Sequence, residues 1–599
     1  MNPLRFSLLS FFSCLGISLF LISPLFAQVF ELGPSPSSNF DAVFNLPGNG
    51  AVIVGNSQSV GGFGLIQLNV STGAVGNFFS ANSGGEVNIS GGSLGTNFSA
   101  NSGSEVNISG GTVGDDFAAN FGSVVNISGG TVGEDFVASS GSLVNISGGS
   151  VGRGFDALSD SEINISGGEF GFFFTAFSGS ELNISGGSFG GGFEVEPGVE
   201  VNISGGFVPG FDAGAGSVVN ISGGTVLFSL NADAGSEVNI SGGTLGDFFT
   251  AQSGSEVSIS GGSVGMGFGG NGVELVGGEF RLNGADFSGS TITLADGDSF
   301  TGTLADGSAF VFADALLDSL TNVTLTSVTL PAADLSPAVV NSPIVSGPTG
   351  LRSGQTLTLQ NGGSLPQNFA VVDAELNLEG GVLGDAGEAA NSVVNIRSGI
   401  LGRQFDAIFS EVNLSGGEVG FGFFAQNSDV NISGGIVGDF FSFSDSVVNI
   451  SGGAVGRSFL ARDGSVVNIT GGTFGEFFSV GSGSVVNISG GTFDDNFTVS
   501  SGGIVNILGT EFFLDGIQLD NLVLGEAFTI TDQNFATLSG LLANGEQFSF
   551  DLSPFTFIGD DFFEAGSTLT VTLTTSVPEP SSSAFIGVVL AMGFARRRR

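Results

Sequence analysis

The residues of this chain that could do chemistry are almost all carboxylates. Asp and Glu number 56 and the basic residues 12, all of them Arg, while Lys, His, Tyr and Trp are absent. Without an imidazole, an amine or a phenol, the acid–base chemistry that remains is that of paired carboxylates, as in glycoside hydrolysis. Carboxylates recur on almost every repeat, however, and Arg153, Arg403 and Arg457 stand alone. We therefore predict that the protein is not an enzyme.

Calcium binding is the other chemistry that carboxylates support, because calcium prefers carboxylate oxygens. Acidic residues occupy the same place in successive repeats, at Glu86 and Glu105, at Glu162, Glu181 and Glu200, and at Glu237 and Glu256. Stacked like charges repel one another, and bound calcium would relieve this repulsion. The simpler interpretation is a solvated acidic face without a metal. We expect no cofactor, and calcium stays open as the alternative.

The most regular polar feature is an asparagine in the repeated segment Val-Asn-Ile-Ser-Gly-Gly. It recurs at steps of 19 or 18 residues, as in Asn88, Asn107, Asn126, Asn145, Asn164 and Asn183. Stacked Asn side chains can form hydrogen-bonded ladders along a pile of strands, so we predict a structural ladder. The functional alternative is a flat Asn-x-Ser face that binds a repeating ligand such as a polysaccharide or ice.

The acidity and composition of the chain limit its partners and its class. Its formal net charge is -44, whereas phosphate binding needs clustered Lys and Arg, so we expect no nucleic-acid partner. Its 61 Phe residues supply apolar surface for a folded core, and its 104 Gly residues predict many tight turns. The one cysteine, Cys14, lies in the N-terminal apolar run, so the fold must hold without disulfides.

One repeat supplies the strands that position these residues. Residues 105–109 alternate polar and apolar side chains, which predicts a half-buried strand with Val106 and Ile108 facing inward. Gly110-Gly111 is expected to turn the chain, and a second short strand is expected over residues 113–117. A phenylalanine follows most of the asparagines after ten residues and predicts a second ladder, at Phe98, Phe117, Phe136 and Phe155.

A single repeat is too small to fold. Burying its apolar side chains contributes about 6–12 kcal/mol, whereas ordering its backbone costs about 20–40 kcal/mol. The repeats must therefore stack, each pairing its strands with the coils above and below. The asparagine series runs from Asn69 to Ser258, where Ser replaces Asn, and again from Asn377 to Asn506. This predicts an all-β protein with two tandem β-solenoids of about 19 residues per coil.

Coils of this length resemble those of right-handed β-helices of the filamentous-haemagglutinin type in period and architecture. The resemblance implies a right-handed coil, although repeats of 18 residues, divisible into three hexapeptides, fit a left-handed β-helix as well. The two solenoids also end alike, because residues 278–284 resemble residues 510–516 and residues 303–307 resemble residues 541–545. We therefore expect a small β-rich module with hairpin turns to follow each solenoid and to cap its open last coil.

These features predict eight segments. They are a signal peptide (1–27), an N-terminal cap or lead-in (28–62), the first β-solenoid (63–278), a β-rich module (279–330), a Pro-containing linker (331–350), the second β-solenoid (351–508), a second β-rich module (509–576) and a sorting tail (577–599).

The N-terminal segment has the pattern of a secretory signal peptide. Arg5 precedes an apolar run from Phe6 to Phe26, and cleavage by signal peptidase is expected between Ala27 and Gln28. A retained membrane anchor is the alternative interpretation.

The C-terminal segment is more specific. It reads Val577-Pro578-Glu579-Pro580, then an apolar run over residues 584–595, then Arg596, Arg597, Arg598 and Arg599. The apolar run is short for a span, which needs about 20 residues, and the arginines would stay cytoplasmic. We therefore expect transient membrane insertion.

This tail closely resembles the PEP-CTERM sorting signal of Gram-negative bacteria, in which a Pro-Glu-Pro motif precedes a short transmembrane run and an Arg-rich end. The resemblance implies processing by a membrane-bound exosortase and release toward the cell surface or an exopolysaccharide matrix. Together with the uniform repeats, it predicts a non-catalytic surface or matrix protein with a structural or adhesive role and exopolysaccharide as a candidate partner. The alternative is a β-helix that binds or cleaves carbohydrate.

Overall fold

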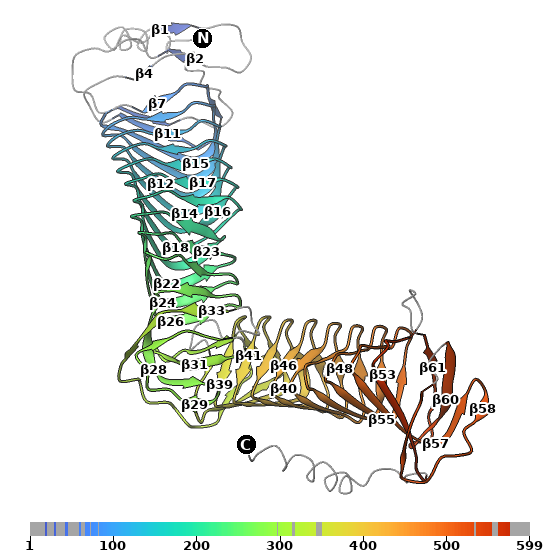
Figure 1. Ribbon diagram of the computed structural model, residues 1–599. Helices are drawn as coiled ribbons and strands as arrows, with labels where there is room; N and C mark the ends of the chain where they lie inside the picture. The colour runs from blue at the N-terminus through green and yellow to red at the C-terminus, as the bar shows by residue number, and fades with distance from the viewer. Residues whose placement is uncertain are drawn as a thin grey trace.

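The computed structural model describes residues 66–575, apart from residues 72, 82, 296, 314–317, 343–349, 532–534 and 554–560. Nearer the N-terminus it describes four short strands, β1 (Ser18–Phe20), β2 (Val29–Glu31), β3 (Ala42–Asn45) and β4 (Ser59–Val60). The described part of the chain forms strands and turns, and no helix in it is long and apolar enough to cross a membrane. The fold is an all-β solenoid, as predicted (Figure 1).

The first solenoid is built on a column of long parallel strands. Successive strands pair with their repeat positions aligned, so Asn107 lies opposite Asn88 on one side and Asn126 on the other. The column begins with β3 and β5 (Ile66–Val70). It continues through β8 (Gly85–Leu94), β10 (Glu105–Val113), β12 (Val124–Val132), β14 (Leu143–Val151), β16 (Glu162–Phe170), β18 (Glu181–Phe189), β20 (Glu200–Val208), β22 (Val218–Val226), β24 (Glu237–Leu245), β26 (Glu256–Val264) and β28 (Glu274–Leu282).

A second column of short parallel strands closes each coil. It begins with β4 and β7 (Ser80–Ala81) and ends with β33, and each strand between pairs with the strands of the coils before and after it. Its members are β9 (Ser99–Ala100), β11 (Ala118–Ala119), β13 (Val137–Ala138), β15 (Phe155–Ala157), β17 (Phe174–Ala176), β19 (Phe193–Val195), β21 (Phe211–Ala213), β23 (Leu230–Ala232), β25 (Thr250–Ala251), β27 (Gly269–Asn271) and β33 (Ser319–Thr321).

In most coils of the first solenoid the double glycine bends the coil without ending the strand, which differs from the expectation of a turn there, whereas in the second solenoid the strand breaks at residues 415–417, 433–435 and 451–453. β10 runs through Gly110 and Gly111, and only its register with the neighbouring coil shifts. The short strand lies at Ala118–Ala119 instead of over residues 113–117, because the chain turns a corner at Asp116 with a left-handed φ of 58°. The backbone N–H and C=O groups at the bend form hydrogen bonds with the coils on both sides, so the strand continues through it.

The bend leaves no room for a side chain at its second glycine. Gly130 has a φ of 82°, and a Cβ there would lie 2.8 Å from the backbone of Gly110 and Gly111 in the previous coil. We expect Gly130→Ala to cost about 2–5 kcal/mol, from left-handed strain plus overpacking. Gly216→Ala is the matched control, because Gly216 has a φ of 76° with nothing within 4 Å. Chemical denaturation should rank the two, and equal losses would show that the close approach costs nothing.

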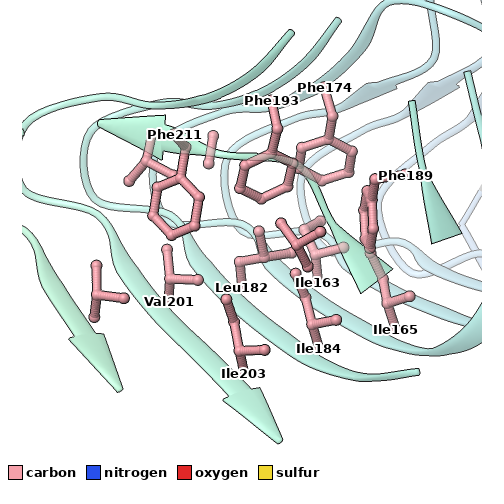
Figure 2. Packing of buried hydrophobic residues seen from close by; sticks show 14 of the residues in the cluster. Ile163, Ile165, Phe174, Leu182, Ile184, Phe189, Phe193, Val201, Ile203 and Phe211 are labelled. Atoms are coloured by element: carbon pink, nitrogen blue, oxygen red, sulfur yellow. The ribbon is translucent and has the colours of Figure 1, made fainter. Parts of the chain in front are cut away.

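The core is the set of side chains that point into the coils. In the coil of β10, Val106, Ile108, Val113, Phe117 and Ala119 are all at most 1% exposed. The same positions repeat up the stack, and Figure 2 shows Phe174, Phe193 and Phe211 above the aliphatic side chains of their own and neighbouring coils. The core is therefore a continuous apolar column along the solenoid axis.

The second solenoid repeats this architecture with a step of 18 residues that later becomes 19. Its long column contains β37 (Thr356–Gln360), β38 (Ser364–Leu365), β40 (Glu375–Leu383), β42 (Val393–Leu401), β44 (Glu411–Leu414), β45 (Glu418–Val419), β47 (Asp429–Ile432), β48 (Ile436–Val437), β50 (Val447–Ile450), β51 (Ala454–Val455), β53 (Val466–Phe474), β55 (Val485–Phe493) and β57 (Ile504–Leu514). Its short column contains β36 (Gly350–Leu351), β39 (Ala370–Val372), β41 (Glu388–Ala390), β43 (Asp406–Ile408), β46 (Phe424–Gln426), β49 (Ser442–Ser444), β52 (Leu460–Arg462), β54 (Ser479–Val480), β56 (Thr498–Val499) and β62 (Phe562–Phe563). β35 (Ala338–Val340), within the segment expected as a linker, pairs with β37.

Each solenoid ends with a hairpin and a returning strand. The last long strand pairs antiparallel with the hairpin and parallel with the strand that returns afterwards, and both ends share this topology. The hairpins are β31 (Ser299–Leu304) with β32 (Ala309–Ala313) and β60 (Ala536–Leu542) with β61 (Gln547–Leu552), and the returning strands are β34 (Val323–Ser327) and β63 (Thr568–Leu573). Phe312 lies 4.9 Å from Phe268 and Phe550 lies 4.7 Å from Phe497, between ring centroids. The hairpins thus cover the ends of the apolar columns.

The two solenoids meet at an elbow, which gives the chain the shape of an L (Figure 1). β32 of the first hairpin packs there on the outer surface of β39 and β41. A small apolar seam joins them, made of Ala309, Val311, Ala313, Ala370, Val372, Ala390 and Ile408.

Candidate functional surfaces

The repeated asparagines form hydrogen-bonded ladders on both solenoids. The Nδ2 of each Asn donates to the Oδ1 of the Asn one coil earlier, over 2.9 Å from Asn107 to Asn88, 2.8 Å from Asn126 to Asn107 and 2.9 Å from Asn145 to Asn126. Asn164 and Asn183 continue the first ladder, and a second one runs from Asn377 to Asn506. These side chains are half-buried, and their amides are engaged in holding coils together.

The glutamates that precede these asparagines serve the same ladder. Glu105 lies opposite Glu86, as the stacking of repeats predicts. Where Glu stands two residues before Asn, it accepts a second bond from the Asn amide, over 2.8 Å from Asn88 to Glu86 and 3.0 Å from Asn183 to Glu181. Within the described ranges no group of three or more acidic or Cys side chains is arranged to hold a metal ion.

A shallow groove follows the ladder along the first solenoid. It encloses about 440 Å³ and is lined by the Asn, Ile and Ser residues of five successive coils, between Asn126 and Ser204. Its lining is uncharged, and its hydroxyls are weakly held, since Ser128 Oγ lies 3.4 Å from the Ile108 carbonyl oxygen. Chemically the groove can offer hydroxyls and amide oxygens to a polar, repetitive ligand.

The ladder should contribute measurably to stability. Asn145→Ala removes the bonds to Asn126 and Asn164, and we expect it to lower the free energy of unfolding by about 1–3 kcal/mol because two half-buried partners lose their bonds. Ser188→Ala, at an exposed position of the same column, should change it by less than about 0.5 kcal/mol. Urea denaturation of both variants measures the difference. Equal stability of the two would mean that water replaces the ladder without cost.

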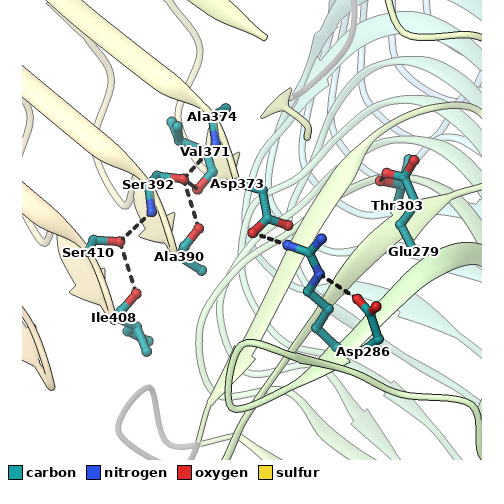
Figure 3. Close-up of polar contacts among 11 residues, drawn as sticks. Glu279, Asp286, Thr303, Val371, Asp373, Ala374, Ala390, Ser392, Ile408 and Ser410 are labelled. Carbon is teal, nitrogen blue, oxygen red and sulfur yellow. Dashed lines mark hydrogen bonds and ion pairs between the residues drawn. The ribbon is translucent and has the colours of Figure 1, made fainter. Parts of the chain in front are cut away.

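The elbow contains the polar contacts that tie the solenoids together. Arg281 of the first solenoid forms an ion pair with Asp373 of the second and lies 3.2 Å from Asp286 (Figure 3). Asn368 of the second solenoid donates to the carbonyl of Leu245 over 2.8 Å, and Ser263 donates to the carbonyl of Asn368 over 2.5 Å.

A ladder of buried serines starts beside this contact. Ser392 Oγ donates toward the carbonyls of Val371 and Ala390 and accepts from the Ala374 amide (Figure 3). Ser410 repeats the pattern one coil later. The serines hold the coil backbone next to the strands on which the first solenoid rests.

Three carboxyl groups are buried at the elbow. Asp318 comes from the first solenoid, and Glu388 and Asp406 come from the second, with side chains at most 5% exposed. Burial raises the pKa of Asp318 to about 8, against the opposing effect of amide donors such as Phe268 N, 2.6 Å away. Burial also raises the pKa of Glu388 and of Asp406 well above the ordinary value, and the neighbouring Asp318 and Asp247 raise both further.

These acids were not found from the sequence, because Glu388 and Asp406 occupy a position of the coil that faces outward away from the elbow, as at Ser442 and Ser479. Perturbed carboxyls often mark functional sites. Here the three carboxyl groups are buried between the two solenoids, where a polymer cannot reach them. We therefore expect their protonation to affect the contact between the solenoids and not a substrate.

The predicted sites at both chain ends lie outside the described residues. This applies to the cleavage site at Ala27 and Gln28 and to the tail from Val577 to Arg599. The tail matches the PEP-CTERM protein-sorting motif over residues 576–599. Comparison with curated proteins and with solved structures finds no match to the chain. The motif identifies the chain as an exported protein that is sorted toward the cell surface of a Gram-negative bacterium, with exosortase as its processing partner.

Proposed function

We propose that this protein is a non-catalytic structural and adhesive component of the cell surface or the exopolysaccharide matrix. The observation that carries the proposal is the uninterrupted coil-to-coil bonding of a stiff rod that bears a sorting motif. At about 4.8 Å per coil, the first solenoid is a rod about 50 Å long, with the groove along its middle coils and the elbow at its end. A rod of this kind can space or cross-link polymers without chemistry.

The composition of the surface supports a role without catalysis. The carboxylates outside the elbow are distributed along the coils, where the Glu residues that precede the ladder accept bonds from Asn amides, and the buried ones are closed off from solvent. Polymer cleavage by two carboxylates needs both groups in one open cleft.

Two measurements on protein from the native host test the proposal. Mass spectrometry of the C-terminal peptide should show that the residues beyond Pro578-Glu579-Pro580 have been removed, and fractionation should place the chain at the surface or in the matrix. An intact Arg599 on a chain retained inside the cell would contradict it.

The second candidate function is a carbohydrate-binding or carbohydrate-cleaving β-helix, which the uncharged groove favours. A glycan array combined with an assay for polymer cleavage separates the candidates. Cleavage of any polysaccharide by the purified exported chain would replace the structural role by an enzymatic one.

A further inference from the structure

Most coils turn a corner just before their buried phenylalanine, and the residue at this corner has a left-handed backbone. Most corners carry residues that tolerate it, such as Asn97, Asp116, Asp135, Gly154, Gly422 and Asn496. Five corners carry Phe instead, with φ values of 59–68° and rings 46–62% exposed: Phe78, Phe173, Phe248, Phe440 and Phe477. A left-handed Phe costs about 1–2 kcal/mol, and a half-exposed ring regains little of it. Because the folded core gains little from these exposed rings, the backbone strain at these positions indicates a role in binding.

On the second solenoid one of these rings, Phe440, lies beside Phe421, which comes just before the left-handed Gly422, and the two rings stand between arginines. In four successive coils, the position just before the left-handed residue is occupied in turn by Arg403, Phe421, Asp439 and Arg457. Backbone hydrogen bonds between neighbouring coils align these positions. The rings of Phe421 and Phe440 lie 4.9 Å apart between centroids and are about half exposed. We call Arg403, Phe421, Phe440 and Arg457 the aromatic corner. It spans about 14 Å along the axis at about 4.8 Å per coil.

The arginines make this corner unusual on so acidic a chain. Seven arginines lie between residues 28 and 575, and three of them, Arg153, Arg403 and Arg457, share this one position of the coil. Arg457 pairs with Asp439 over 3.1 Å, while the guanidinium of Arg403 is exposed and has no ion pair within the described part of the chain.

The first solenoid carries a shorter version of the arrangement. Arg153 stands one coil before Phe172, which lies beside Phe173 with a centroid distance of 6.4 Å. Its guanidinium is held by Glu134 over 2.8 Å. At this coil position, the arginine without an ion pair is therefore on the second solenoid, one coil from a pair of rings tilted by 54° to each other.

We propose that the aromatic corner binds a segment of an acidic polysaccharide. Phe421 and Phe440 offer ring faces to the apolar faces of sugar rings, and Arg403 offers a planar fork that matches a carboxylate. The groups run along the solenoid axis in successive coils, which suits an extended chain. The proposal rests on the proposed function, and it names the partner class and the surface that such a matrix protein would use.

The same geometry disfavours a protein or a lipid surface as the occupant. Such partners need a contiguous apolar patch with a dry centre. Here the rings form a single narrow line, with Asp439 and Gln404 beside them at the same corner. Carboxylate and amide groups can instead accept or donate bonds to sugar hydroxyls.

The test measures binding of the full exported chain to polygalacturonate, dextran and polyglutamate. The salt concentration is 0.15 M, because the Debye length is then about 8 Å and repulsion from the acidic residues elsewhere on the chain is screened. We expect binding to polygalacturonate, weaker binding to dextran and none to polyglutamate. Phe440→Asn and Arg403→Gln should each weaken binding by roughly tenfold. Because Asn tolerates the left-handed corner, Phe440→Asn should leave the melting temperature unchanged or higher.

Phe535→Asn is the matched control, since Phe535 is 61% exposed with a φ of 61° but lies in the C-terminal module. It should leave binding unchanged. Loss of binding in this control, unaltered binding by Phe440→Asn, equal binding of polyglutamate, or no binding of polygalacturonate would each overturn the proposal. The structural role would still stand if the chain is processed, reaches the matrix and cleaves nothing, so the two failures are distinguishable.

Discussion

Truncation of one core phenylalanine, Phe117→Ala, should lower the free energy of unfolding by about 3–5 kcal/mol. The Phe117 ring is 0% exposed and lies between Phe98 and Phe136, at centroid distances of 4.8 and 4.7 Å. Its loss removes two stacked ring contacts, each worth about 0.5–1.5 kcal/mol. It also leaves a cavity in the single column of buried side chains that forms the core of the solenoid. Because a coil contacts only its neighbours, we expect the N-terminal coils to separate from the rest.

Hydrogen exchange and limited proteolysis measure this outcome directly. Exchange should rise in the coils before Phe117 while the second solenoid stays protected. Phe121→Ala is the matched control in the same coil, because the Phe121 ring is 68% exposed, and its effect should be below about 0.5 kcal/mol. Loss of protection along the whole chain, or no difference from the control, would contradict a column that unfolds coil by coil.

The column could be predicted from the sequence because every contributing residue recurs at a fixed step. Val106, Ile108 and Phe117 keep their places in the repeat, and stacking brings equal places together. The position of the short strand was wrong by a few residues, since the corner at Asp116 takes a left-handed turn that spacing alone does not reveal.

The elbow and the aromatic corner depend on information that periodicity does not carry. Glu388 and Asp406 have the pattern of outward-facing residues, and only the docking of β32 on their sheet buries them. The arginines were recognised as isolated, but their shared corner position beside exposed rings appears only when the coils are aligned in space. The handedness of the coil stays a prediction.

Raising the pH should open the elbow. Burial raises the pKa values of three carboxyl groups in the closed elbow, those of Asp318, Glu388 and Asp406. The pKa of the half-buried Asp247 next to them is also raised, chiefly by burial. A group of this kind favours the closed form fully below its ordinary pKa, near 4, and loses that effect as the pH rises toward its value in the closed form, about 8 for Asp318. Between these two pH values, each rise of one pH unit lowers the stability of the closed form relative to the open form by up to about 1.4 kcal/mol per such group.

The remaining charges at the elbow do not cancel this effect. Two cations lie at the contact. Arg281 lies between Asp373 and Asp286 at its edge, and the buried Arg352, beside Gly307 of the first hairpin, donates to the carbonyl of Pro331. Burial, together with the neighbouring Glu279 and Asp286, raises the pKa of Asp373 despite the opposing effect of Arg281, so this carboxyl acts in the same direction. The apolar seam is small and does not titrate, so it sets the strength of closure without its pH dependence.

Small-angle scattering between pH 5 and pH 9 measures the angle between the two solenoids. We expect one closed shape at pH 5 and a broader distribution of shapes above about pH 8, with each solenoid still folded by circular dichroism. Glu388→Gln keeps the volume of the side chain but removes one titrating group, so it should move the opening to higher pH. Glu411→Gln, exposed on the same solenoid, should leave it in place. A scattering profile that stays constant from pH 5 to pH 9 would mean that the buried carboxyls remain protonated throughout and that the elbow is rigid.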